Sequence, residues 1–130
     1  MPQTFKKEER LCNRNQIKEL FEKGNVIKAY PLKMLWEKKD DNDTFPVQIL
    51  IAVPKRNIKK AVLRNKIKRR IREGYRKNKY RFQEAIINQK LSCSAVILFS
   101  GKEEISYIDT ETKIIQLLER LMVEYAKNNQ

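Results

Sequence analysis

The stretch AVLRNKIKRRIREGYR, residues 61–76, decides the fold because it predicts a long amphipathic helix. Its apolar side chains recur at every fourth position, at Leu63, Ile67, Ile71 and Tyr75. At 100° per residue this spacing gives a stripe about 120° wide, which is typical of a helix face that packs against a core. The sequence therefore predicts a helix with one buried face.

The face opposite the apolar stripe predicts a basic ridge. This ridge is formed by Asn65, Arg69, Arg72 and Arg76, with Lys66 and Lys68 at its two edges. Gly74 lies within the stripe, where glycine costs about 1 kcal/mol of helix propensity relative to alanine, and so it predicts a close packing contact. We expect the helix to extend over about residues 59–78, a length of about 30 Å.

The net charge of the chain lies almost entirely in this region. Residues 55–81 hold fourteen lysines and arginines and a single acidic residue, Glu73, and so carry a charge equal to the net +13 of the whole chain. Basic side chains three or four positions apart on a helix repel one another, so a polyanion stabilises such a ridge. A merely solvated surface helix is the alternative, but nucleic acid is the partner that the charge pattern favours.

The rest of the chain predicts three or more strands and two further helices. The first helix is expected over about residues 9–23, capped by Asn13 or Asn15 and ended at Gly24. Extended segments are expected over residues 26–38, 47–53 and 93–99, with an extra short strand at 26–29 as an option, and a last helix over 109–127, capped by Asp109 or Thr110.

These elements follow the order α-β-β-α-β-α, or α-β-β-(β)-α-β-α with the extra strand, which predicts a two-layer α/β (α+β) sandwich. The 3 glycines and 4 prolines are too few for a flexible linker, so we expect a single domain over residues 1–130. The strand, helix and strand between residues 47 and 99 predict a β-α-β crossover. Such a connection is right-handed by default when its strands are parallel.

The composition excludes several classes of chemistry. The chain has no histidine, and its two cysteines, Cys12 and Cys93, lie far apart in the sequence. We therefore expect neither a histidine-based catalytic site nor a structural zinc site, and no glycine-rich loop predicts nucleotide binding. The chain also lacks a long apolar run and an N-terminal signal pattern, so we expect a cytoplasmic protein with no catalytic residues, protein-bound metal or membrane partner of its own.

The order of residues within the basic region carries a family resemblance. Residues 53–76, VPKRNIKKAVLRNKIKRRIREGYR, resemble the signature segment of the bacterial ribonuclease P protein subunit. That segment has a strand that ends before two basic residues and then a helix that reads R-N-R-[IV]-K-R-x-x-R-E-x-[FY]-[RK]. The flanks are similar too, in the helix end Phe21-Glu22-Lys23-Gly24 and in Tyr30-Pro31-Leu32, which leads into a strand.

The resemblance implies a fold and a function. Members of this family form an α/β sandwich that resembles a ribosomal-protein domain, with a left-handed β-α-β crossover. Their partner is a catalytic RNA, which cleaves precursor transfer RNA at its 5′ side with magnesium ions held mainly by the RNA. The protein subunit binds that RNA through the signature helix and binds the single-stranded 5′ leader in a cleft between the first helix and the sheet. No obligate protein partner is implied.

Carried over to this chain, the resemblance implies two sets of binding residues. The set for the catalytic RNA consists of Lys55, Arg56, Arg64, Asn65, Lys66, Lys68, Arg69 and Arg72, to which the ridge adds Arg76. The leader cleft is expected to contain Ile17, Phe21 and Trp36.

The chain departs from the family pattern in three places. Lys66 stands in place of the usual arginine, Ile17 in place of an aromatic residue, and Arg70 in place of an aliphatic one. A second hypothesis is a general structured-RNA-binding protein, such as a ribosomal or assembly protein. A DNA-binding regulator ranks last, because no short helix and tight turn precede the basic helix.

Overall fold

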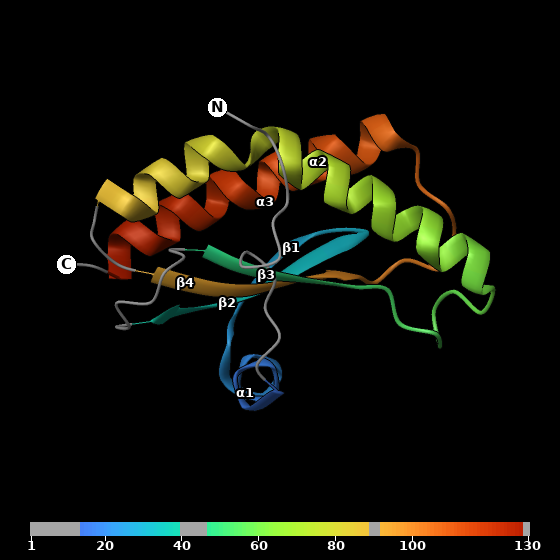
Figure 1. Cartoon of the computed structure of the whole chain (residues 1–130), viewed down its shortest axis with the longest axis horizontal. Coiled ribbons are helices and arrows are strands. Elements are labelled where there is room, and N and C mark those ends of the chain that lie inside the picture. The colour runs from blue at the N-terminus through green and yellow to red at the C-terminus, as the bar shows by residue number, and fades with distance from the viewer. Residues whose placement is uncertain (1–13, 40–46, 89–91, 129–130) are drawn as a thin grey trace.

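The structure, a computed structural model, describes residues 14–39, 47–88 and 92–128. Three helices and a four-stranded sheet make up this part of the chain (Figure 1). In chain order the elements are α1 (Arg14–Lys23), β1 (Asn25–Ala29), β2 (Leu32–Lys39), β3 (Val47–Ala52), α2 (Ala61–Asn88), β4 (Ser92–Phe99) and α3 (Tyr107–Asn128). The optional strand at residues 26–29 is thus present as β1, and the predicted α/β fold class is confirmed.

The strands of the sheet lie in the order β1-β2-β4-β3. β1 and β2 form an antiparallel hairpin, closed by a turn that contains the cis Tyr30–Pro31 peptide bond. β2 and β4 are antiparallel, whereas β3 and β4 are parallel. The connection from β3 through α2 to β4 is therefore the predicted β-α-β crossover. The left hand that the family resemblance implies for it stays a prediction.

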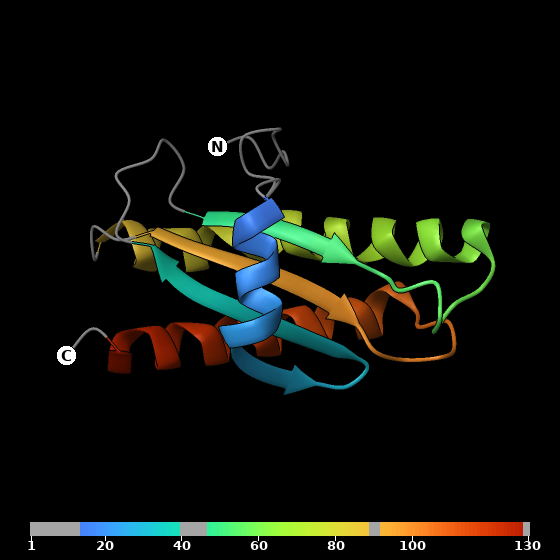
Figure 2. The ribbon, with the colours of Figure 1, turned by 90° about the horizontal axis from the view of Figure 1, so that it is seen from below.

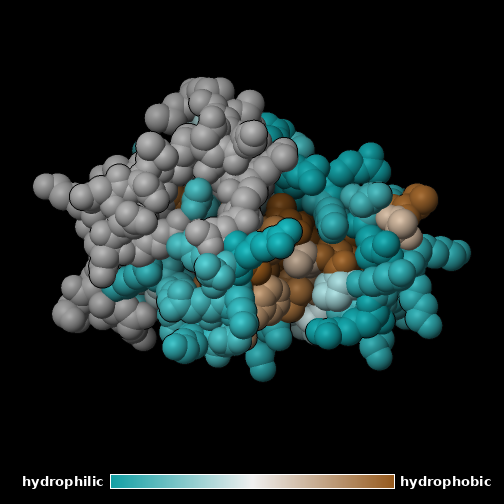
Figure 3. Space-filling view, turned by 60° about the horizontal axis from the view of Figure 1, so that its bottom comes forward, coloured by the Kyte–Doolittle hydropathy of each residue, from teal (hydrophilic) through white to brown (hydrophobic). Residues whose placement is uncertain are grey.

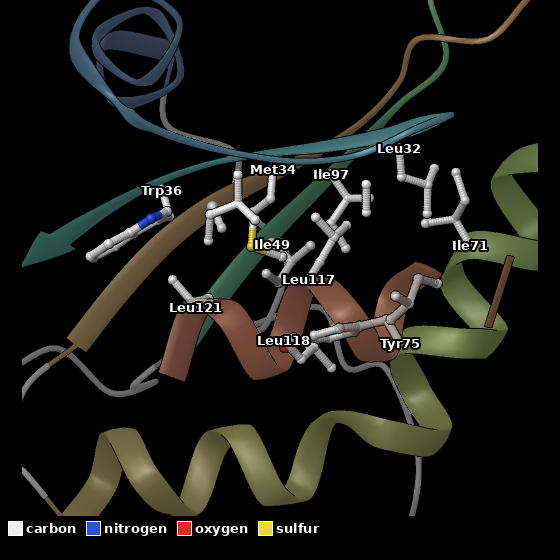
Figure 4. Packing of buried hydrophobic residues seen from close by; sticks show 14 of the residues in the cluster. Leu32, Met34, Trp36, Ile49, Ile71, Tyr75, Ile97, Leu117, Leu118 and Leu121 are labelled. Atoms are coloured by element: carbon white, nitrogen blue, oxygen red, sulfur yellow. The ribbon is translucent and has the colours of Figure 1, made fainter. Parts of the chain in front are cut away.

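The helices lie on both faces of the sheet. α2 and α3 lie side by side on one face, and α1 crosses the other face (Figures 1 and 2). The main core lies between the sheet and the helix pair, where Met34, Trp36, Ile97, Leu117 and Leu121 are fully buried (Figure 4). The outer side of α2 and the α1 side of the sheet both lie outside this core.

α2 packs as its sequence predicts but is longer. Ile67, Ile71 and Tyr75 are fully buried, which confirms the apolar stripe. The helix continues to Asn88, ten residues beyond the expected end, and reaches about 42 Å. Phe82, which lies two turns after Tyr75, is also fully buried and continues the apolar stripe through this extension.

The ends of α1 show how local sequence sets helix boundaries. α1 is described from Arg14, so the cap predicted at Asn13 lies outside the described residues. At its other end Gly24 N donates to Leu20 O at 2.9 Å, and a Cβ on Gly24 would lie 2.5 Å from that oxygen. Gly24 has no positive φ, so the close approach explains the glycine.

The predicted cap of α3 is wrong. Asp109 N donates to Ser106 Oγ at 3.1 Å, and Thr110 Oγ1 donates to Ser106 O at 2.7 Å. Ser106 therefore caps the helix, and Asp109 and Thr110 lie in its first turn rather than at its cap. The spacing of serine and aspartate at positions 106 and 109 was the signal in the sequence.

Two further expectations concern thiols and membranes. Cys93 is a buried free thiol, whereas Cys12 lies outside the described residues. None of the helices in the described part of the chain combines the length and hydropathy that crossing a membrane requires.

Candidate nucleic-acid interface

The outward side of α2 exposes Asn65, Arg69 and Arg72, as the ridge predicts, with Lys68 half-buried at one edge. The buried stripe on the opposite side of the helix holds these side chains toward solvent. Among residues 14–39, 47–88 and 92–128, no carboxylate pairs with Arg69 or Arg72. Their guanidinium groups can therefore each donate two parallel hydrogen bonds to phosphate oxygens.

Arg76 differs from Arg69 and Arg72 because it pairs with Glu73. Arg76 Nε donates to Glu73 Oε2 at 3.4 Å, and a closer contact joins Arg76 Nη2 to Glu73 Oε1. The hydrogen bond from Arg76 lowers the pKa of the Glu73 carboxyl below its usual value. The one acidic residue of the basic segment thus compensates the charge of Arg76.

At the other edge of the ridge, two cations meet a carboxylate from a distant segment. Arg70 Nη1 lies 2.8 Å from Glu104 Oε2, and Lys66 Nζ lies 3.3 Å from the same oxygen. Arg70 Nη1 also donates to Ile105 O at 2.6 Å. The hydrogen bonds from Arg70 and Lys66 lower the pKa of Glu104. Arg70, which departs from the family pattern, therefore ties α2 to the connection between β4 and α3.

Arg64 shapes the segment that leads into α2. Its Nη1 donates to Ile58 O at 3.0 Å and to Lys59 O at 2.8 Å. Asn57 Nδ2 donates to Phe99 O at 3.2 Å, which joins the same segment to the end of β4. The predicted RNA contact Arg64 is thus also a structural residue.

Lys55 and Arg56 are exposed in the turn that follows Pro54. The turn is closed by hydrogen bonds from Asn57 N and Ile58 N to Pro54 O, at 3.1 and 3.2 Å. It therefore presents two further cations near the start of α2. Their contact with RNA stays a prediction.

The opposite side of the sheet forms a second surface, named here the α1 face. It consists of the α1-directed residues of the strands, Lys33, Leu35 and Glu37 in β2, Gln48, Leu50 and Ala52 in β3, and Ser94, Val96 and Leu98 in β4. Leu20 of α1 is fully buried against this face, and Ile17 packs beside it together with Leu50 and Ala52. Figure 3 shows apolar surface in a hollow among hydrophilic side chains on this side of the molecule.

Phe21 follows the buried Leu20 in α1. It is one helical turn after Ile17, so the two side chains share a side of the helix. Phe21 is 51% exposed, which is unusual for so large an apolar side chain and leaves its ring free for stacking. The structure therefore brings Ile17 and Phe21 together as expected, and their role in leader binding stays a prediction.

The expectation that Trp36 lines the same cleft is wrong. Trp36 is fully buried on the other side of β2, in the main core. Its Nε1 donates to Glu124 Oε2 at 3.4 Å, and its ring centroid lies 5.9 Å from that of Tyr125 in α3. Because successive residues of a strand point to opposite faces, the neighbours of Trp36 in β2, Leu35 and Glu37, lie on the α1 face instead.

The α1 face also holds a carboxylate with an unusual environment. The pKa of Glu37 is raised above its ordinary value, first by burial and then by the nearby Glu19 of α1, although Lys23 partly opposes the shift. Two carboxylates thus approach each other where α1 meets β2.

Several of these features were not predicted from the sequence. Leu50 and Ala52 are partly buried on the α1 face, and period-two alternation along residues 47–52 would have grouped them on one side of the strand without showing that this side faces α1. The pairing of Glu104 with α2 has no local signal, because the two segments are joined only by the crossover.

Comparisons with a family profile and with individual proteins point to the same family. The sequence profile of the family described as Ribonuclease P matches residues 5–122 of this chain. The ribonuclease P protein component of Geotalea uraniireducens is 30% identical over 117 residues, which cover 90% of this chain and 94% of that protein. The ribonuclease P protein component of Porphyromonas gingivalis is 29% identical over 104 residues, covering 78% of this chain and 76% of that protein.

Solved structures show the same fold. The ribonuclease P protein of Thermotoga maritima superposes with a TM-score of 0.65 at 25% identity, covering 86% of this chain and 96% of that chain. The ribonuclease P protein of Staphylococcus aureus superposes with a TM-score of 0.66 at 19% identity, covering 85% of this chain and 93% of that chain. These likenesses confirm the arrangement of three helices around a four-stranded sheet.

Proposed function

The chain belongs to the ribonuclease P protein family, and from that premise we propose that it binds a catalytic RNA and the 5′ leader of precursor transfer RNA. In this proposal it promotes endonucleolytic 5′ maturation of transfer RNA as the accessory subunit of the enzyme, and the catalytic groups belong to the RNA. The proposal assigns one surface of the protein to each RNA partner.

The outer side of α2 is the proposed site for the catalytic RNA. The observation that carries this assignment is the exposure of Arg69 and Arg72 on one side of a helix whose other side is buried. Lys55 and Arg56 extend the positive surface at the start of the helix. Such a surface binds phosphates at fixed spacing without reading sequence, which suits a structured RNA.

The α1 face is the proposed site for the leader. A cleft that accepts many different leaders must tolerate sequence, and stacking of bases on an exposed ring does so, at about 1–3 kcal/mol per base. Phe21 supplies the ring, and the apolar side chains of Ile17, Leu50 and Ala52 supply the adjoining surface. Lys33 lies on the same face, where its ammonium group could contact a leader phosphate.

The magnesium ions required for cleavage are assigned to the RNA. In the described residues no three acidic, cysteine or histidine side chains come together as a metal-binding group. The proposal therefore assigns no magnesium ligand to the described residues and leaves the ions to the RNA.

A general structured-RNA-binding protein is the second candidate, because the exposed arginines of α2 would serve any folded RNA. A helix-turn-helix regulator has less support, since residues 53–60 before α2 form a turn flanked by irregular segments rather than a helix. Affinity for precursor relative to mature transfer RNA separates the two RNA-binding candidates. Only the leader-binding function predicts tighter binding of the precursor.

Reconstitution tests the proposal. The protein would be combined with the catalytic RNA of its own organism and labelled precursor transfer RNA at low magnesium concentration. We expect no cleavage by the protein alone and faster 5′ cleavage by the complex than by the RNA alone. A cleavage rate that the protein does not change would contradict the proposal.

A further inference from the structure

One oxygen of Glu104 lies between two cations of α2. Lys66 and Arg70 are one helical turn apart, and their terminal nitrogens lie 3.3 and 2.8 Å from Glu104 Oε2. The side chains of Lys66 and Glu104 are 44% and 41% exposed, and that of Arg70 is 22% exposed. The three groups therefore form an anion site at the surface, already occupied by an anion from the protein itself.

We infer that Lys66 and Arg70 form a phosphate site for the RNA backbone, which Glu104 occupies in the free protein and vacates when RNA binds. A nonbridging phosphate oxygen has the charge and acceptor geometry of a carboxylate oxygen, so it can take the place of Glu104 Oε2. This inference rests on the proposed function, because it names an added contact between α2 and the catalytic RNA.

Glu104 can leave without unfolding its segment. Arg70 Nη1 also donates to Ile105 O at 2.6 Å, and this main-chain contact holds the connection between β4 and α3 in place. Glu104 also lines an open hollow of about 540 Å³, together with Lys102 and Ser106, into which its side chain can rotate. Exposed ion pairs contribute little to stability, so their exchange costs little.

The RNA has an advantage over Glu104 in this competition. Glu104 offers one negative charge, whereas an RNA strand along α2 reaches Lys66, Arg69 and Arg72 together. Each phosphate that is neutralised also releases condensed counterions, which favours the bound RNA at moderate salt. The carboxylate thus satisfies the two cations in the free protein and yields to the stronger ligand.

The neighbouring Glu103 provides a matched control. It is exposed and belongs to the same connection, and it pairs with no cation within the residues that the structure describes. Glu103→Gln and Glu104→Gln therefore remove the same charge from nearly the same place, and only the second empties the site. The experiment measures the Kd of the full-length protein for its catalytic RNA at fixed salt, with circular dichroism and Tm as folding controls.

We expect Glu104→Gln to tighten binding by about three- to tenfold, the size expected from two exposed ion pairs, and Glu103→Gln to change it by less than about twofold. In an Arg70→Met background, where Lys66 still faces Glu104, the effect of Glu104→Gln should be smaller, and in a Lys66→Met, Arg70→Met background it should fall to that of Glu103→Gln. Glu104→Asp, which keeps the charge but shortens the side chain, should also tighten binding and serves as the second variant if Glu104→Gln does not fold.

Equal Kd values for Glu103→Gln and Glu104→Gln, or weaker binding by a folded Glu104→Gln protein, would overturn the inference while the proposed function stands. Failure of the unmodified protein to bind the catalytic RNA would overturn both.

Discussion

Gly74 of α2 lies directly against Ile114 of α3. A Cβ on Gly74 would come within 2.7 Å of Ile114 Cδ1, and both residues are buried where the two helices meet. The glycine is therefore a packing residue, as its position in the apolar stripe predicts. The contact sets how closely α2 approaches α3, and through that approach it positions the outer side of α2.

Gly74→Ala should destabilise the protein when residue 114 is isoleucine and stabilise it when residue 114 is valine. In the native background we expect a loss of about 1 kcal/mol, because overpacking costs about 1–3 kcal/mol and alanine recovers about 1 kcal/mol of helix propensity. Ile114→Val removes the Cδ1 methyl, so in that background Gly74→Ala should stabilise the protein. Urea unfolding of the four proteins measures this, and the same sign in both backgrounds would refute the packing argument.

Replacing both Arg69 and Arg72 with alanine should weaken binding of the catalytic RNA without unfolding the protein, since both side chains are exposed. If the native protein neutralises about six phosphates, log K against log salt should have a slope of about −4 to −5. The double variant should reduce the size of that slope by about 1 to 2. A variant that loses its fold would show that these arginines are structural.

Phe21→Ala and Trp36→Phe should separate leader binding from stability. Phe21→Ala removes an exposed ring, so we expect the preference for precursor over mature transfer RNA to fall by about fivefold or more, with little change in the free energy of unfolding. Trp36→Phe should cost about 1–2 kcal/mol of stability, because it removes buried surface and the contact with Glu124, and should leave the preference unchanged. A loss of the precursor preference in Trp36→Phe, with no loss in Phe21→Ala, would instead place Trp36 in the leader site.

Glu37→Gln should stabilise the protein near neutral pH. The pKa of Glu37 is raised in the folded state by burial and then by Glu19, so the charged form is disfavoured relative to the unfolded chain. This cost is fully present above the folded-state pKa and disappears as the pH falls toward the ordinary value of 4.5. The gain from the substitution should therefore shrink in unfolding experiments at acidic pH. A gain that does not depend on pH would rule out the electrostatic cause.

Several elements could be predicted from the sequence because their signals are local. Between residues 63 and 75 an apolar residue occurs at every fourth position, which indicates a helix with one buried face, and the structure confirms this helix. The missed cap of α3 also had a local signal, in Ser106 and Asp109. The hydrogen bonds and side-chain directions involved depend on residues a few positions apart, so the sequence contains the necessary information.

The error at Trp36 has a different origin. Period-two alternation separates the residues of β2 into two sets, Leu32, Met34 and Trp36 in one and Lys33, Leu35 and Glu37 in the other. The second set also contains a buried apolar residue, Leu35, because this central strand is covered on both faces. Alternation therefore cannot show which set faces α1, and the packing of Leu20 on Leu35 decides it.

The sequence by itself determined the basic helix, its buried stripe and the concentration of net charge in residues 55–81, because these depend on periodicity and composition. Only the tertiary structure decided which of these basic side chains pair with a carboxylate and which remain available to a partner. In the part of the chain that the structure describes, Arg69 and Arg72 pair with no carboxylate, whereas Lys66 and Arg70 meet Glu104, more than thirty residues later in the chain. Coulomb interactions depend on distance in space, and the crossover that brings Glu104 to α2 is set by the packing of the whole sheet.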